Sequence, residues 1–180
     1  MECRRWARVN PKSLILCLLG SVCMLISGCY EPILSLDFNE EGVSPLTITV
    51  IGGDMVSEED MNVVFSQLTM LIPELLKNYD CRVEGKQIVL TRRDFALAQD
   101  FPYITFKKQA DGSYLFEAAI PALYATEQES DDIFMTLRVS LPRTINMANT
   151  IDVNDRTATW TVRKNQLHKA QRLRAVTIAG

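Results

Sequence analysis

The chain has 180 residues, of which 47% are hydrophobic, and its 19 basic and 22 acidic residues give a formal net charge of −3. This length and composition suit a single globular domain. The acidic balance argues against nucleic acid as the principal partner, because phosphate binding needs a basic surface.

A secretory signal that ends in a lipid-attachment site is predicted at the N-terminus. Basic residues at positions 4, 5, 8 and 12 precede the mostly apolar run Leu14–Ile26, and the small residues Ser27 and Gly28 stand directly before Cys29. This order is typical of a signal peptide, and a cysteine right after the cleavage point is typical of a bacterial lipoprotein. The apolar run rises about 20 Å as a helix, whereas a hydrocarbon core is roughly 30 Å thick. We therefore predict cleavage between Gly28 and Cys29, with the lipid on Cys29.

Residues 29–180 are then expected to form one extracytoplasmic domain that is held on the membrane by its lipid. Removal of four basic and one acidic residue from the 19 and 22 leaves 15 and 21, a formal charge of −6. Cys81 is the one cysteine left outside the signal and the lipid site, so this domain has no internal disulfide. Because Cys81 begins an apolar-alternating run, we predict a small buried hydrophobe rather than a reactive thiol.

The first elements expected in the domain are a hairpin and a long helix. Alternating apolar and polar residues predict strands over Ile33–Phe38 and 46–50, joined by a turn at 39–42. A helix should begin at Ser57, which is followed by three acids, and apolar residues then recur every three or four positions over Met61–Leu76. Pro73 should kink or divide this helix near Leu71.

Further hairpins are expected along the rest of the chain. One has Asp111-Gly112 in its turn, a pair that suits positive φ. The remaining predicted strands are 81–83, 88–91, 103–107, 114–120, 135–141, 151–153, 157–162 and an edge-like strand at 173–178, with short helical stretches at 93–99 and 165–171. The predicted fold class is α+β, a mainly antiparallel sheet built from hairpins with one long amphipathic helix packed on one face.

Motifs for catalysis or metal binding are scarce. His168 is the one histidine, it stands among basic residues, and we expect it to face solvent rather than to serve as a base or ligand. The four acids of the segment 126–132 lack the spacing of a calcium loop, so an exposed loop is predicted. No catalytic residue, cofactor or metal site is predicted.

A basic segment at 163–174 holds five basic residues and no acidic one. If it is helical, Lys164, His168 and Arg172 share one face. Lys164, Lys169 and Arg172 are candidate contacts for anionic lipid, each worth about 1 kcal/mol beside a charged bilayer. The alternative is an ordinary solvated face.

Several of these features together resemble the LppM-type domain of bacterial lipoproteins and related lipoprotein families. They are the start Ser27-Gly28-Cys29, the strand Leu34–Phe38 leading to Glu41-Gly42, the helix after Ser57, and the closing segments Thr159-Trp160-Thr161-Val162 and Leu173-Arg174-Ala175-Val176. The resemblance implies an envelope-anchored, non-catalytic domain, and lipid or glycolipid binding is suggested for some members.

The function expected from the sequence is therefore non-catalytic binding or scaffolding at the cell envelope. Its partners would be the membrane, through the lipid, and an anionic lipid, a glycolipid or an envelope protein. An alternative is a carrier that holds an apolar or amphipathic ligand between helix and sheet. A distant alternative is a hydrolase that uses acidic residues alone, which needs paired carboxylates about 5–10 Å apart in a cleft.

Overall fold

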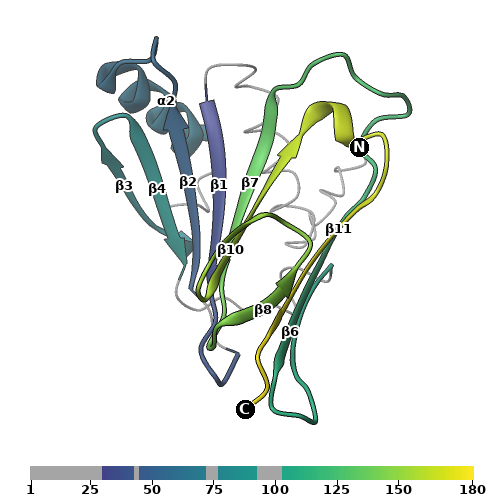
Figure 1. Ribbon diagram of the computed structural model, residues 1–180. Helices are drawn as coiled ribbons and strands as arrows, with labels where there is room; N and C mark the ends of the chain where they lie inside the picture. Colours follow the sequence, from purple (N-terminus) through teal and green to yellow (C-terminus); the bar gives the residue numbers. More distant parts are fainter. Residues whose placement is uncertain (1–29, 43–44, 72–76, 93–102) are drawn as a thin grey trace, which may run out of the picture.

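This computed structural model describes residues 30–42, 45–71, 77–92 and 103–180. In these residues the chain forms two β-sheets and an α-helix, Glu58–Leu71 (Figure 1). In chain order the elements are β1 (Tyr30–Asp37), β2 (Leu46–Gly52), α2 (Glu58–Leu71), β3 (Asp80–Glu84), β4 (Gln87–Arg92), β5 (Ile104–Lys108), β6 (Tyr114–Ile120), β7 (Ile133–Ser140), β8 (Ile145–Ala148), β9 (Asp152–Asn154), β10 (Thr157–Arg163), the 3-10 helix η1 (Lys164–Gln166) and β11 (Gln171–Thr177). The predicted signal and Cys29 lie outside the described residues.

The four hairpins predicted from alternation are confirmed. The antiparallel pairs are β1 with β2, β3 with β4, β5 with β6 and β9 with β10. Gly112 has a φ of +82° in the turn between β5 and β6, as the Asp-Gly pair predicts. Short-range patterns thus identified most of the strands and their nearest partners.

Long-range pairing organises these hairpins into two sheets rather than the single sheet expected. The seven-stranded sheet has the order β3-β4-β2-β1-β7-β10-β9, and β1 pairs with β7 in parallel. The four-stranded sheet has the order β5-β6-β11-β8. The predicted edge-like strand at 173–178 is therefore an interior strand, because β11 lies between β6 and β8.

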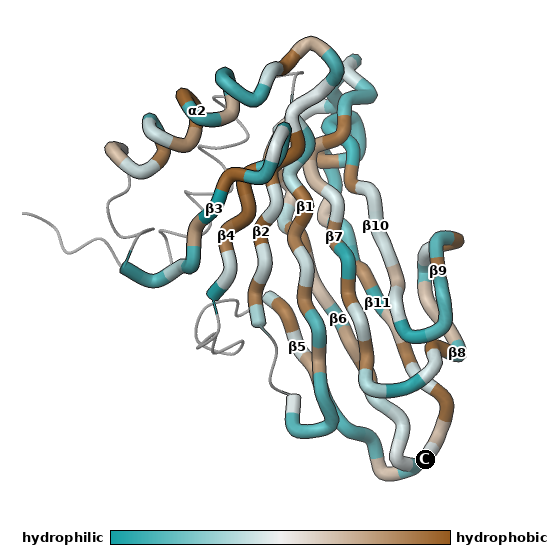
Figure 2. Tube along the Cα trace, turned by 90° about the vertical axis from the view of Figure 1, so that its left-hand side faces the viewer, coloured by the Kyte–Doolittle hydropathy of each residue, from teal (hydrophilic) through white to brown (hydrophobic). Residues whose placement is uncertain are grey.

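The core lies between the two sheets and is rich in aromatic rings. Phe116 on β6 lies 5.8 Å from Trp160 on β10, and 6.0 Å from Phe38 just after β1, between ring centroids. Figure 2 shows hydrophobic and hydrophilic residues alternating along the strands of the seven-stranded sheet, with β6 and β11 behind them. The inner residues of the two sheets therefore bury one another. The second sheet takes the place at the core that the sequence analysis assigned to a long helix.

The predicted α+β class with one long helix is wrong, because strands hold far more of the described residues than helices do. The helix α2 begins where Ser57 predicts it, with reciprocal hydrogen bonds between Ser57 and Asp60. Met61 and Leu68 are buried, whereas Val63 and Met70 are 51% and 81% exposed. The apolar residues of α2 therefore do not all belong to one buried face. The helix contributes fewer side chains to the core than its number of apolar residues suggests.

Two other helix predictions have different outcomes. The stretch at 93–99 and the end of the long helix, 72–76 with Pro73, lie outside the described residues. The helix at 165–171 is wrong, because η1 is a single 3-10 turn and Gln171 already belongs to β11. Over the described residues, no helix has the length and apolar character needed to span a bilayer.

Candidate functional site

The first feature of interest is the end of the molecule where β1 begins, which we call the anchor end because Tyr30 directly follows Cys29. The parallel register of β1 with β7, and a 2.9 Å hydrogen bond from Thr136 Oγ1 to Glu31 Oε1, place the start of β7 at this end. The last residue of β10, Arg163, pairs with Ile133. The loop 121–132 and η1 therefore lie at the anchor end, as Figure 1 also shows.

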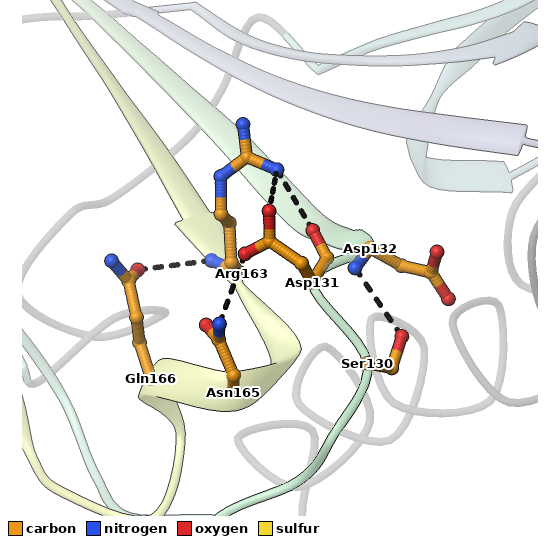
Figure 3. A network of polar contacts seen from close by, with 6 residues as sticks. All are labelled: Ser130, Asp131, Asp132, Arg163, Asn165 and Gln166. Atoms are coloured by element: carbon orange, nitrogen blue, oxygen red, sulfur yellow. Dashed lines mark hydrogen bonds and ion pairs between the residues drawn. The ribbon is translucent and has the colours of Figure 1, made fainter.

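The acidic loop and the basic segment, considered separately in the sequence, contact each other at the anchor end (Figure 3). Arg163 Nη1 donates to the backbone oxygen of Asp131 at 2.8 Å and to its Oδ2 at 3.1 Å. Asn165 Nδ2 donates to Asp131 Oδ1 at 2.9 Å, and Lys164 Nζ lies 3.0 Å from Asp132 Oδ2. Much of the positive charge of the basic segment is therefore already paired within the chain.

The three residues predicted to contact anionic lipid consequently differ in availability. Lys164 is held by Asp132, and its side chain is 21% exposed. Lys169 and Arg172 are exposed, and neither side chain has an ion-pair partner among the described residues. Because Arg172 lies on β11 and Lys169 in the preceding turn, the shared helical face does not exist.

Two titratable groups of the anchor end complete this arrangement. His168 is largely covered rather than solvent-facing, with Nδ1 at 2.7 Å from the backbone oxygen of Asn165 and Nε2 at 4.0 Å from Glu127 Oε2. Hydrogen bonding to Ser130 and then the nearby Lys164 ammonium lower the pKa of Asp132 below its ordinary value. Asp132 is therefore ionised at neutral pH, which maintains its ion pair with Lys164.

A recess lies at the opposite end of the molecule, which we call the far recess. Its volume is about 440 Å³, and it is lined by the turn Glu40–Gly42, all five residues of β5, and Tyr114. The turn Glu40–Gly42 follows the end of β1, an eight-residue strand roughly 25 Å long, so this wall of the recess lies about one strand length from the anchor end. Gly42 has a φ of +81°, and a Cβ there would lie 3.3 Å from the ring of Phe106. Glycine thus allows the turn to approach β5 closely.

Two lining residues of the far recess, Phe106 and Tyr114, belong to a stack of aromatic rings that has cations beside it. Phe106 stacks on Phe38 with centroids 4.4 Å apart and on Tyr114 with centroids 5.4 Å apart. Lys108 Nζ and Arg143 Cζ each lie 5.7 Å from the centroid of the Tyr114 ring, within the range of a cation–π contact. The recess therefore combines aromatic rings with charges of both signs, because Glu40, Glu41, Lys107 and Lys108 all line it.

Tyr114 is fully buried, yet its phenol oxygen has no hydrogen-bond partner among the described residues. Its backbone N–H donates to Thr177 Oγ1 at 2.8 Å, so the strand itself is well fixed. A buried polar group without a partner carries a desolvation penalty of about 1–3 kcal/mol.

Sequence reasoning did not find the far recess, because its parts come from separate hairpins. The turn at 39–42 and the strand at 103–107 were predicted, but no local pattern indicates that Phe38 stacks on Phe106. The recess also does not lie between helix and sheet, where the carrier alternative would place it, and Met61 and Leu68 of α2 are packed in the core. Among the described residues, no group of three or more metal-binding side chains occurs.

Cys81, near the start of β3, is a half-buried free cysteine. Its Sγ lies 3.4 Å from the backbone oxygen of Tyr79, and the side chain packs against the core. Burial, and then the neighbouring Asp80 carboxylate, raise the pKa of this thiol above its ordinary value. The thiolate is therefore scarce at neutral pH, and the side chain is half-buried rather than buried as predicted.

Comparison with known proteins gives a structural neighbour. No protein-family model matches the chain, and no curated protein matches it. A solved structure similar to this chain is the folded domain of the Mycobacterium tuberculosis LppM protein, determined by NMR. It is 10% identical, the match covers 84% of this chain and 90% of that one, and the TM-score is 0.48.

Proposed function

We propose that this protein is a lipid-anchored domain on the extracytoplasmic side of a bacterial envelope, and that it binds a partner without catalysing a reaction. The observation that carries the proposal is the position of Cys29. It follows the apolar run and the small residues Ser27 and Gly28, and it directly precedes β1. A lipid on Cys29 would thus connect to the folded domain without a linker.

The two ends of the domain support a division of roles. The anchor end would lie toward the bilayer, and Lys169 and Arg172, which have no ion-pair partner in the described part of the chain, would meet anionic headgroups there. The far recess, which combines aromatic rings with charged side chains, would face away from the membrane. Concave, partly apolar sites with a few polar groups are typical of binding sites. Binding in the far recess is therefore favoured over a carrier cavity under α2.

The anchor is tested by replacing Cys29 with alanine in the full chain. Because the thiol is the point of lipid attachment, the variant should remain an unprocessed precursor without acyl mass. Detergent phase partitioning and intact-protein mass spectrometry read the two effects, and Cys81→Ala serves as the matched control that should still be processed and lipidated. A Cys29→Ala protein that is cleaved and acylated as the wild type is would disprove the proposal.

A further inference from the structure

We propose that the side chain of Met55 enters the lipid bilayer, so that the domain stands on the membrane with the turn between β2 and α2 against the lipid. The inference rests on the proposed function, because it needs the lipid on Cys29, and it adds a second point of membrane contact. Three observations carry it, namely the exposure of Met55, its nearness to the lipid site, and the rigid turn that presents it.

Met55 is 93% exposed, although its side chain is large and apolar. It lies in a tight turn, in which the N–H of Val56 donates to the oxygen of Gly53 at 3.0 Å. The next residue, Val56, is 6% exposed and belongs to the core. The turn therefore buries one of two adjacent apolar side chains and leaves the other outside the fold, where a partner can cover it.

The turn lies beside the lipid site. Gly52, the last residue of β2, is the antiparallel partner of Tyr30, the first residue of β1, and Figure 1 shows α2 at the end of the molecule where β1 begins. Opposite residues of such a pair are about 5 Å apart between Cα atoms, and each further residue adds at most about 3.8 Å. Met55 thus lies within about 17 Å of Tyr30, which directly follows Cys29. Because no linker separates the lipid from β1, the bilayer surface must lie close to this turn.

Packing and hydrogen bonds hold the turn in place. A Cβ on Gly52 would lie 2.8 Å from Val56 Cγ1 and 3.0 Å from Met61 Sδ, so both side chains rest directly on the end of β2. Lys86 Nζ also donates to the backbone oxygen of Asp54 at 3.1 Å. A side chain that is presented by a fixed turn loses little conformational freedom when it inserts, so more of the gain from its burial remains.

A second exposed apolar residue lies on the other side of β1. The loop 121–132 leads into β7, which flanks β1 opposite β2, and it contains Leu123, which is 44% exposed. The N–H of Leu123 donates to the oxygen of Leu167 at 2.8 Å, which keeps this residue at the anchor end. The lipid site therefore lies between two exposed apolar side chains, and three points of contact would determine how the domain stands on the surface.

The charges around Met55 indicate which part of the membrane it meets. Asp54, Glu58 and Glu59 are exposed acidic residues close to it along the chain. Anionic headgroups would repel these carboxylates, so the contact is with the acyl chains and not with headgroup charge. The lipid on Cys29 already confines the domain to the surface, and the burial of Met55 then has to select only an orientation.

The test places a tryptophan at position 55 of the full-length lipidated protein on vesicles of phosphatidylcholine that is brominated near the top of its acyl chains. Bromine quenches the fluorescence of an indole that it contacts. Met55→Trp should lose about half of the emission that it adds to the wild type, because apolar interfacial side chains lie about 5–10 Å into the boundary of headgroups and acyl chains. Trp160 gives a constant background, since it is 4% exposed and belongs to the core.

Met147→Trp is the matched control, because Met147 is also an exposed methionine, at 63%, and lies on β8. It pairs with Val176 near the end of β11, whereas β11 begins beside η1 at the anchor end. Met147→Trp should therefore keep its emission on the brominated vesicles, and Leu123→Trp should be quenched as Met55→Trp is. High salt should leave the quenching unchanged, because an apolar contact is not screened.

Three results would overturn the inference. The first is a Met55→Trp protein that is acylated and floats with the vesicles but is not quenched, and in that case the proposed anchor at Cys29 would still stand. The second is equal quenching of Met55→Trp and Met147→Trp, which would show that the domain has no preferred orientation. The third is emission of Met55→Trp that changes with protein density on vesicles without bromine, which would identify a second copy as the contact. A chain without acyl mass would instead disprove the proposed function itself.

Discussion

Tyr114 combines complete burial with an unsatisfied phenol oxygen, and this makes its stability effect unusual. Removing a hydroxyl that makes hydrogen bonds destabilises a protein, whereas removing one that makes none relieves a desolvation cost. We therefore expect Tyr114→Phe to raise the free energy of unfolding by about 1 kcal/mol, measured by urea denaturation. A loss of stability of similar size would contradict the unsatisfied state of the oxygen and would indicate a hydrogen bond within the fold.

Leu68 gives the opposite case, because it is an apolar residue of α2 that is 5% exposed and belongs to the core. Leu68→Asp places a charge in an apolar environment, which should cost several kcal/mol and unfold a marginally stable domain. Val63→Asp is the matched control, since Val63 lies on the same helix and is 51% exposed. Thermal melting followed by circular dichroism measures both variants. Equal melting temperatures would mean that the inner side of α2 does not stabilise the domain.

At the scale of elements, the acidic loop and the basic segment compensate each other. The pairs Arg163 with Asp131 and Lys164 with Asp132 join residues 32 positions apart. Surface ion pairs of this kind contribute little stability each, because they are exposed to solvent and screened by salt. Their more direct consequence concerns recognition, since Lys164, one of the three cations expected to meet anionic lipid, is already in contact with a carboxylate.

Lysine reactivity provides a test of this view. In vesicles that contain anionic lipid, acylation of Lys169 in the lipidated protein should be slower than in neutral vesicles, because headgroups approach its ammonium group. High salt should remove the difference, since such attraction is screened over about 10 Å. Lys164 should react slowly in both vesicles because Asp132 holds it, and Lys107 in the far recess should react equally in both.

Mass spectrometry of the protein after lysine labelling measures the extent of labelling at Lys107, Lys164 and Lys169 in one sample. If Lys169 reacts at the same rate on neutral and anionic vesicles at low salt, the basic segment is a solvated face. If Lys107 is slowed instead, the far recess and not the anchor end lies against the bilayer.

At the scale of the whole molecule, the sequence predicts the pairing of strands that are neighbours along the chain, but not the pairing of distant strands. Alternation and turn residues identified four hairpins, because the partners in a hairpin are close in sequence and share one turn. The strand β8 was missed because Ile145–Ala148 has a single buried residue and no alternation. The division into two sheets was missed because the parallel pairing of β1 with β7 joins segments about a hundred residues apart.

The candidate sites follow the same rule. The basic segment was visible in the sequence because its residues are contiguous, but its neutralisation was not, because the carboxylates come from another loop. The far recess was invisible for the same reason. The rings of Phe38, Phe106 and Tyr114, which stack at the recess, come from three separate segments.

The central position of β1 also determines how the molecule bears mechanical load. Any pull transmitted through a lipid on Cys29 would act along β1, which is flanked by β2 on one side and β7 on the other. Inter-strand hydrogen bonds run across the strands, so such a force shears two rows of bonds at once and does not open them one by one. An edge strand that carried the tether would resist much less, because one row of hydrogen bonds holds it. The proposed lipid on Cys29 would thus be joined to an interior strand that is held on both sides.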